Sequence, residues 1–289
     1  MEGFESSELY SITNDFYHGA YARVLQEGVE TFSPANQVTA RCLQARSLIA
    51  LGRHDEVERS QEPALAAVYA LAQDSKGADV SADMDALLKD HGGDGNVVLL
   101  AALYLSRHLQ HREALDVLIK AGDAVGVEGV ALMVQLHLLL YRPDLAHSLV
   151  DGAKRVNGDA VPVVLAEAWT HLHRGGSEYE DAFYIYEEAA QIPVSATSRM
   201  LTGQGVTELH LGRPEEAVVA FSQAAKLGGE EGVQVGDALA NALVAHIQLG
   251  ASTDKIQEAR AEVQRRTPNH VLLQDVQEKS ALFDALAAR

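Results

Sequence analysis

Histidine is the residue type that first suggests chemistry in this chain, because 12 of the 289 residues are histidines. Two close pairs make a metal site the first hypothesis to consider: His108 with His111, and His171 with His173. The first pair falls across a predicted hairpin turn at Leu109-Gln110, and residues two apart on a helix point in different directions. No HExxH or CxxC pattern accompanies either pair. We therefore interpret these histidines as solvated or capping residues and not as metal ligands.

Glycine-rich segments and the single cysteine are the next candidates for chemistry. Gly203-Gln-Gly205 and Gly92-Gly93-Asp-Gly95 follow no predicted strand and lack the Gly-Lys-Ser/Thr and GxGxxG contexts that bind phosphate. We interpret the first segment as a packing notch within a helix and the second as a surface turn. Cys42 has only Arg41 and Arg46 as nearby basic residues and no matched histidine, which favours a buried structural thiol over a nucleophile.

Adjacent glutamates can be explained by helix stability without a catalytic role. Glu215 and Glu216 follow Pro214 at a predicted helix start, where the helix dipole favours acidic side chains by about 0.3–1 kcal/mol each. Glu187-Glu188 falls on an exposed face in the same interpretation. No acid–base pair emerges, so we predict that the protein is not an enzyme, binds no cofactor or metal and has no small-molecule substrate.

The charge of the chain narrows the range of partners. The chain has 41 acidic and 23 basic residues, which gives a net charge of −18. Such a surface repels phosphate backbones and anionic lipid, so we predict no nucleic-acid binding and no direct membrane insertion. The longest apolar run, near 130–140, is interrupted by Gln135 and His137, and the acidic start at 1–8 lacks the order of a signal peptide. We expect a cytoplasmic protein.

The elements that carry these residues are predicted to be helical hairpins. In Ser198–Leu227, apolar residues recur at helical spacing on both sides of Gly212 and Pro214. Glycine permits the left-handed backbone that ends a helix, and proline suits the first position of the next helix. This segment therefore predicts two helices joined by a tight turn.

The hairpins recur at a nearly constant period. We align the small or β-branched residue one turn into each second helix: Val24, Val57, Ala114, Ala146, Ala182 and Ala217. The separations are 33, 57, 32, 36 and 35 residues, and four of the five lie near about 34 residues, the tetratricopeptide period. We predict an all-α fold, a right-handed α-solenoid of tetratricopeptide-like helical hairpins, as a single domain over residues 1–289.

Two departures from regularity are expected within this array. The separation of 57 residues predicts an irregular unit at about 63–95, and a domain boundary there is the competing interpretation. Helices expected at 254–267 and 271–288, separated by Thr267-Pro268, predict a C-terminal capping helix pair at about 253–289.

Three segments resemble one family. They are Asn14–Tyr21 (NDFYHGAY), Ala168–Tyr186 (AWTHLHRGGSEYEDAFYIY) and Thr267–Leu286 with its Lys279 and Phe283-Asp284. In this order along the chain they are similar to the epsilon subunit family of coatomer, the COPI vesicle coat. The resemblance implies a non-enzymatic coat subunit that binds the C-terminal domain of the alpha subunit of coatomer. It also implies retrograde Golgi-to-ER transport and a peripheral location on Golgi and COPI vesicle membranes through the coat.

The inner wall of such a solenoid is formed by the first helix of each hairpin. The residues that we predict to bind a partner on this concave face are Leu99, Leu103, Leu138, Leu165, Trp169, Val206 and Leu209. This set is apolar, whereas wall positions that clamp carboxylate tails carry lysine, arginine or asparagine, and only Asn96 and Arg199 qualify here. We expect a groove for a helix or hairpin of the partner, with Trp169 as the best single candidate because tryptophan is enriched at binding hot spots. Packing between repeats is the competing interpretation for each residue, and a generic tetratricopeptide adaptor for chaperones or signalling is the alternative function.

Overall fold

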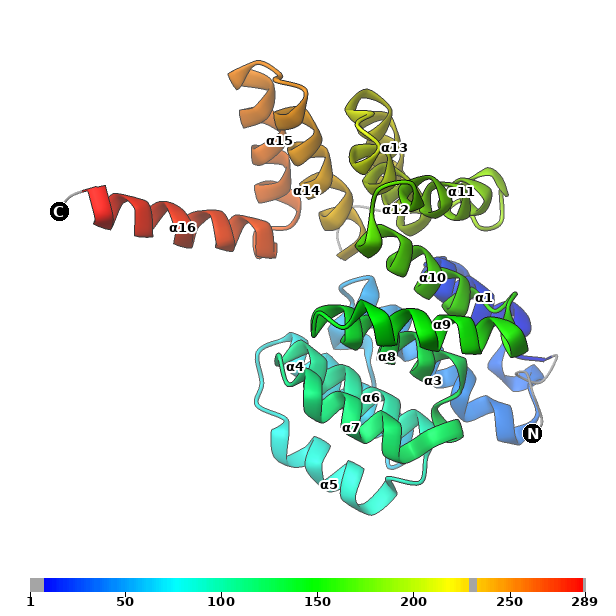
Figure 1. Cartoon of the computed structure of the whole chain (residues 1–289). Helices are drawn as coiled ribbons and strands as arrows, with labels where there is room; N and C mark the ends of the chain where they lie inside the picture. The colour runs from blue at the N-terminus through cyan, green and yellow to red at the C-terminus, as the bar shows by residue number, and fades with distance from the viewer. Residues whose placement is uncertain (1–7, 229–232, 288–289) are drawn as a thin grey trace. The chain divides into compact units, whose positions relative to one another are not determined.

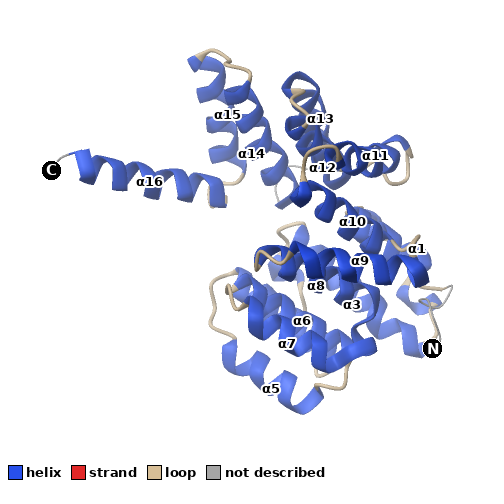
Figure 2. Cartoon of the chain, viewed as in Figure 1, coloured by secondary structure: helices blue, strands red, loops and turns tan. Residues whose placement is uncertain are grey.

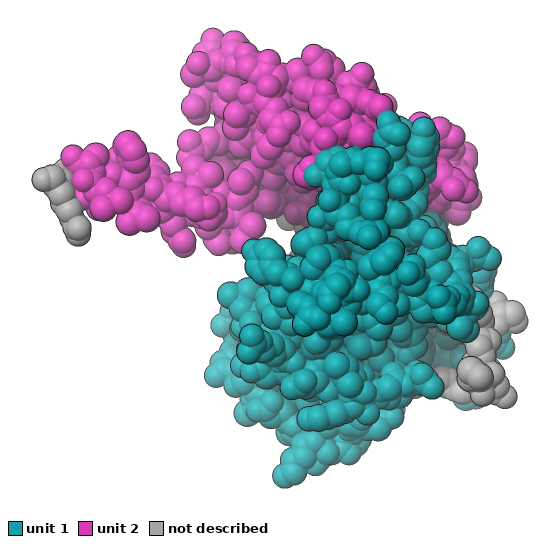
Figure 3. Space-filling model, viewed as in Figure 1, with its two compact units in different colours: residues 1–185 teal, residues 186–289 magenta. Residues whose placement is uncertain are grey.

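The computed structural model describes residues 8–228 and 233–287, so most of the acidic start lies outside the described part. Within those ranges every regular element is a helix, as Figures 1 and 2 show. The all-α class predicted from the sequence is confirmed. The chain divides into two compact units, residues 1–185 (unit 1) and residues 186–289 (unit 2), which Figure 3 colours separately. No helix in the described ranges is long and apolar enough to cross a membrane.

Unit 1 is a succession of helices connected by short turns. Its elements are α1 (Tyr10–His18), α2 (Tyr21–Val24), η1 (Val29–Thr31), α3 (Pro34–Ala50), η2 (His54–Glu56), α4 (Pro63–Ser75), α5 (Ser81–His91), α6 (Gly95–Arg107), α7 (His111–Ala121), η3 (Gly122–Val125), α8 (Gly126–Leu139), α9 (Pro143–Asn157), α10 (Val161–Arg174) and the first part of α11 (Glu178–Gln191). The first helices α4, α6 and α8 begin 32 and 31 residues apart, close to the roughly 34-residue tetratricopeptide period. The unit boundary falls within α11.

Unit 2 continues with two further hairpins and a last helix. Its elements after α11 are α12 (Ser198–His210), α13 (Pro214–Leu227), α14 (Val233–Gln248), α15 (Thr253–Arg266) and α16 (Val271–Ala287). The two helices expected near the end of the chain are therefore present within one or two residues of their predicted limits. α15 packs against α14, whereas α16 runs away from both in Figure 1, and residues 274–287 are all exposed.

A small, fully buried residue near the start of the second helix is common to four hairpins. Each of these residues lies within a second helix and has 0% exposed surface: Ala114, Ala146, Ala182 and Ala217. A methyl side chain at a contact lets two helix axes approach closely, because the axial distance depends on the side chains between them. The alignment of these four positions is confirmed.

The alignment is wrong at Val57. This residue is buried, but it follows the short helix η2 with extended backbone (φ −76°, ψ 111°) and does not lie in a second helix. The five residues 58–62 are all polar, so a helix there would have no apolar face to bury. An extended connection therefore replaces the second helix after α3, and the segment 63–95 contains the helices α4 and α5.

Six first helices end in the same backbone motif. The residue two positions beyond α3, α4, α6, α8, α12 and α14 has a positive φ, and the N–H of the next residue donates to the carbonyl five positions earlier. Glycine occupies the left-handed position at Gly52, Gly77, Gly212 and Gly250. In two unit 1 hairpins it is occupied by Leu109 (φ 61°) and Tyr141 (φ 57°). Left-handed backbone costs about 1–2 kcal/mol for a residue with a Cβ atom, so these two turns are strained.

Two glycines of α12 allow aromatic rings to pack directly on its backbone. A Cβ atom on Gly203 would lie 2.3 Å from the ring of Tyr186, and one on Gly205 would lie 2.5 Å from the ring of Phe221. Both distances are shorter than any van der Waals contact, so these positions require glycine in this packing. The predicted packing notch is confirmed.

Unit 1 also contains contacts between hairpins that are not neighbours along the chain. Tyr17 on α1 donates a hydrogen bond of 2.7 Å from its Oη to Glu128 on α8, and Arg46 on α3 donates two, one of them 3.0 Å long, to the same carboxylate. The guanidinium also lies 4.6 Å from the ring centroid of Phe16. Burial alone would lower the pKa of Arg46, but the charge and hydrogen bonds of Glu128 raise it. This Arg46–Glu128–Tyr17 network joins residues 111 and 82 positions apart.

Candidate partner-binding surface

The predicted binding residues lie on the first helices of hairpins, namely α6, α8 and α10 in unit 1 and α12 in unit 2. In unit 1, Leu99 and Leu165 are each only 4% exposed, so they fill the core between helices. Three further side chains are half-buried: Leu103, Leu138 and Trp169. Of the predicted residues in unit 1, only Leu103, Leu138 and Trp169 therefore remain accessible to a partner.

Trp169 combines packing with accessibility. It and Leu138 lie on α10 and α8 and contact the same core cluster, whose members are Ala131, Val134, Ala146, Val150 and Ala166. All five of these cluster residues are buried, whereas the indole and the Leu138 side chain keep part of their surface exposed. A large ring that is held in place by a small-residue core and remains partly accessible has the features of a binding hot spot.

Unit 2 carries the remaining two predicted residues. Val206 and Leu209 are half-buried on α12, where they pack against Ala217, Phe221 and Ala245. They form an apolar patch within unit 2. The role of the seven residues in binding stays a prediction.

The sequence-based prediction omits a polar network that joins α9, α10 and α11. His171 Nδ1 lies 3.0 Å from Glu178 Oε2, and its Nε2 lies 3.4 Å from Glu167 Oε1. Lys154 pairs with Glu167, and Arg174 pairs with Glu178. The hydrogen bond with His171, followed by the charge of Arg174, lowers the pKa of Glu178. The spacing of four residues between Glu167 and His171, and again between Arg174 and Glu178, is the signal in the sequence that could have revealed this network.

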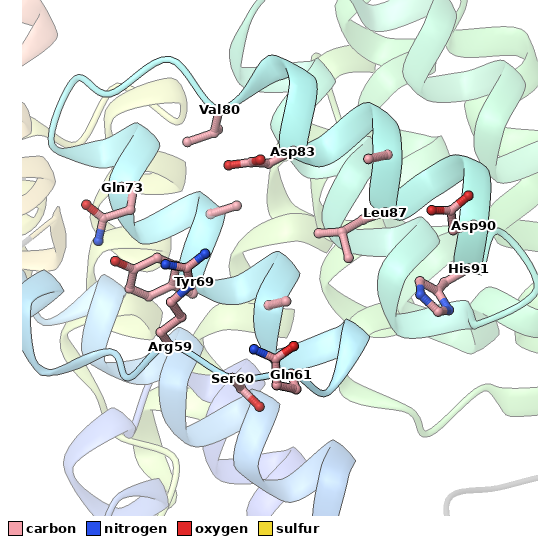
Figure 4. A pocket seen from close by; sticks show the side chains of 13 residues that line it. Arg59, Ser60, Gln61, Tyr69, Gln73, Val80, Asp83, Leu87, Asp90 and His91 are labelled. Carbon is pink, nitrogen blue, oxygen red and sulfur yellow. The ribbon is translucent and has the colours of Figure 1, made fainter.

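An open groove of about 330 Å³ lies where the extended connection replaces a helix. Its lining residues come from the connection at 59–61, from α4, and from α5 together with Val80 just before it, as Figure 4 shows. The rim carries both signs of charge, with Arg59 on the connection and Asp83 and Asp90 on α5. The groove is thus a consequence of the missing second helix, and its rim as a whole favours neither sign of charge in a ligand.

The cysteine and the histidine pair that the sequence offers for chemistry, Cys42 and His108 with His111, lie in surroundings that do not favour reactivity or metal binding. Cys42 is 2% exposed, and burial raises the pKa of its thiol to about 12, so the reactive thiolate is scarce near neutral pH. His108 lies 2.7 Å from Asp74, and His111 begins α7. Among residues 8–228 and 233–287, no group of three or more His, Cys, Asp or Glu side chains is placed to hold a metal ion.

Comparison of the whole sequence with known protein families shows which family the chain belongs to. The profile of the coatomer epsilon subunit family matches residues 5–289. The chain belongs to this family. Members of the family are subunits of the COPI coat, so this chain is a peripheral coat component that assembles with other coatomer subunits.

Individual relatives agree with the family profile over most of the chain. The probable coatomer subunit epsilon of Schizosaccharomyces pombe is 29% identical over 225 residues, which cover 76% of this chain and 74% of that protein. Coatomer subunit epsilon-2 of Arabidopsis thaliana is 26% identical and covers 98% and 96% of the two chains. Coatomer subunit epsilon of Dictyostelium discoideum is 25% identical and covers 97% and 98%.

Solved structures support the fold. A tetratricopeptide repeat protein from Parabacteroides merdae has a TM-score of 0.53 at 13% identity and covers 85% of this chain and 99% of its own. The APC/C hetero-tetramer Cut9–Hcn1 has a TM-score of 0.59 at 14% identity and covers 96% of this chain and 57% of its own. These likenesses confirm the tetratricopeptide-like α-solenoid predicted from the hairpin period.

Proposed function

We propose that this coatomer epsilon family member is a non-catalytic scaffold that binds the C-terminal domain of the alpha subunit of coatomer. It would act in retrograde Golgi-to-ER transport, on the cytosolic face of Golgi and COPI vesicle membranes. The observation that carries the proposal is the family match over residues 5–289, together with the partly accessible apolar side chains on first helices.

The expected contact is apolar and centred on Trp169. Leu103, Leu138 and Trp169 keep part of their surface exposed in unit 1, and Val206 and Leu209 do so in unit 2. A helix or hairpin of the partner suits such positions better than an extended acidic tail, because the predicted wall offers no row of basic side chains. The buried Leu99 and Leu165 would support this surface from beneath.

Isothermal titration of the full chain with the purified C-terminal domain of the alpha subunit tests the proposal. Trp169→Ala is expected to weaken binding about 30-fold, since truncation of a hot-spot tryptophan costs about 2 kcal/mol or more. Ile119→Ala is the matched control, because Ile119 is a 58% exposed apolar residue on α7, a second helix. Circular dichroism checks that both variants stay folded.

Two results would contradict the proposal. Failure of the wild-type chain to bind the alpha domain would remove the partner and favour a generic tetratricopeptide adaptor. Unchanged affinity of a folded Trp169→Ala variant would show that the contact is not centred on Trp169, while the alpha subunit would remain the partner.

A further inference from the structure

The groove beside α4 lies where the other hairpins of unit 1 place a second helix. Second helices pack on the first helix of the following hairpin, as α2 does on α3, α5 on α6, α7 on α8 and α9 on α10. Between α3 and α4 the chain forms only the short helix η2 and an extended connection. The groove of about 330 Å³ runs along α4, between this connection and α5 (Figure 4). It therefore marks a helix position that the chain itself does not fill.

The shape of the groove suits a helix. The residues of α4 that line it recur at the three- and four-residue spacing of one helix face and are Ala66, Tyr69, Ala70 and Gln73. Two of them are alanines, which let another helix approach closely, because the distance between packed helices depends on the side chains between them. Leu87 of α5 adds apolar surface to the same floor. The lining of α4 extends over about 10 Å, which is the length of two helical turns.

The charges of the groove are sorted between its two sides. Asp83 and Asp90 stand seven residues apart on α5, so they share one face and lie about two turns from each other. Arg59 stands on the connection at the other side, as Figure 4 shows. All three side chains are exposed, and none of them forms an ion pair among the described residues. A ligand of uniform charge would be repelled by one side, whereas a helix with a basic edge and an acidic edge complements both.

A second copy of the chain is a poor occupant of this groove. Its most exposed helix is α16, in which residues 274–287 include three acidic residues and Lys279 as the single basic one. Lys279 is already paired with Asp275 at 2.6 Å. Two chains that each carry a net charge of −18 also repel each other at long range. Charge complementarity therefore favours a helix from a different protein.

We infer that this groove docks an amphipathic helix of another protein, with two basic residues about two turns apart on one edge and an acidic residue on the other. The basic residues would pair with Asp83 and Asp90, and the acidic residue with Arg59. Apolar side chains between the two edges would pack on Ala66 and Leu87. None of the residues that line the groove belongs to the predicted alpha-subunit contact, so the inference goes beyond the proposed function and does not depend on it.

Fluorescence anisotropy of the full chain with two synthetic peptides of about 14 residues, four helical turns, tests the inference. Both peptides carry leucine and alanine at helical spacing on one side. The first has two lysines seven residues apart on one edge of that side and a glutamate on the other edge, and the second has glutamate at all three positions. The first peptide is expected to bind at least about tenfold more tightly, and less tightly as salt rises. Ala66→Gln, which fills the floor without adding charge, should weaken its binding at least about tenfold.

Charge reversal on α5 tests the pairing directly. Asp83→Lys with Asp90→Lys should weaken binding of the first peptide at least about tenfold, because each change replaces an attraction by a repulsion. Asp85→Lys with Asp116→Lys is the matched control and should change binding less than twofold. Both of these residues are exposed and lie outside the groove, on α5 and α7, and the two changes alter the net charge of the chain equally. Circular dichroism checks that every variant stays folded.

Three results would overturn the inference. Equal weakening in both double variants would show that only long-range attraction acts on the peptide. Equal binding of both peptides, or full binding by a folded Ala66→Gln variant, would show that the groove is not the site. In sedimentation velocity, a dimer that the reversal of Asp83 and Asp90 abolishes and the matched control retains would assign the groove to self-association instead.

Discussion

The two units hold their hairpins together by different means. Unit 1 contains a charged network in which Glu128 of α8 binds Arg46 of α3 and Tyr17 of α1, elements that are distant along the chain. Unit 2 relies on close approach of consecutive elements, as where Tyr186 and Phe221 pack on Gly203 and Gly205. Contacts between consecutive hairpins need only small residues at a fixed period. A contact between distant hairpins needs a specific partner, and the part-buried Glu128 carboxylate and Arg46 guanidinium provide one.

The largest expected effect breaks the network of unit 1. Glu128→Ala leaves the part-buried Arg46 guanidinium without its carboxylate and removes the acceptor for Tyr17. We expect the unfolding free energy to fall by about 2–4 kcal/mol, because each hydrogen bond to a charged group contributes about 1.5–3 kcal/mol. Urea denaturation followed by circular dichroism measures the change. The double variant Arg46→Met with Glu128→Leu should recover part of the loss, because no unpaired charge remains buried. A single variant as stable as wild type would show that the network contributes nothing.

A smaller effect is expected for the glycine packing of unit 2. Gly205→Ala should lower the unfolding free energy by about 1–3 kcal/mol, because the added methyl overlaps the Phe221 ring. Gly152→Ala is the matched control: it lies on α9, and an added Cβ meets no heavy atom within 4 Å. Alanine should there stabilise the helix by up to about 1 kcal/mol through its higher helix propensity. Opposite signs in thermal melts are the expected result, and stabilisation by both changes would contradict the packing argument.

The strained left-handed backbone at Tyr141 in unit 1 predicts that glycine at this position stabilises the protein. Tyr141→Gly should raise the unfolding free energy by about 0.5–1 kcal/mol, since glycine adopts the left-handed backbone freely and the ring that is lost is 85% exposed. Tyr141→Ala removes the same ring but keeps the Cβ atom, so it should not stabilise. Equal melting temperatures for the glycine and alanine variants would indicate that the turn is unstrained.

The smallest effect concerns pH and the Glu178 carboxylate. Because its folded pKa lies below the ordinary value, its contribution to stability is complete above the unfolded pKa and is lost as pH falls through the folded pKa. Glu178→Gln should therefore lower the unfolding free energy by less than about 1 kcal/mol near pH 7, since the carboxylate is partly exposed. The difference from wild type should vanish in strongly acidic buffer. Denaturation curves at several pH values measure it, and a difference independent of pH would contradict this assignment.

The repeat period was predictable because each hairpin repeats the same local requirement. Ala114, Ala146, Ala182 and Ala217 stand at nearly equal separations and are fully buried in second helices. The alignment is wrong at Val57, because a buried valine is compatible with an extended connection as well as with a helix. The polar residues 58–62 predict the extended connection correctly, since a helix there would have no apolar side to bury.

The binding surface was less predictable for a physical reason. A first helix of a hairpin contacts other helices on more than one side, so apolar spacing alone does not distinguish Leu165, which is buried, from Trp169, which remains partly exposed. The Arg46–Glu128 contact joins residues 82 positions apart and depends on the path of every intervening turn. Only the three-dimensional course of the chain brings these two residues together.

The hydrogen bond between Tyr17 and Glu128 has a consequence for folding during synthesis. The ribosome makes α1 before α8, so 111 further residues must be added after Tyr17 before its carboxylate partner is present. During that interval α1 and its apolar residues Ile12 and Phe16 have only the next two helices to cover them. Synthesis in this direction therefore leaves a docking step that completes late, and Tyr17 reaches its final hydrogen bond only after α8 has been made.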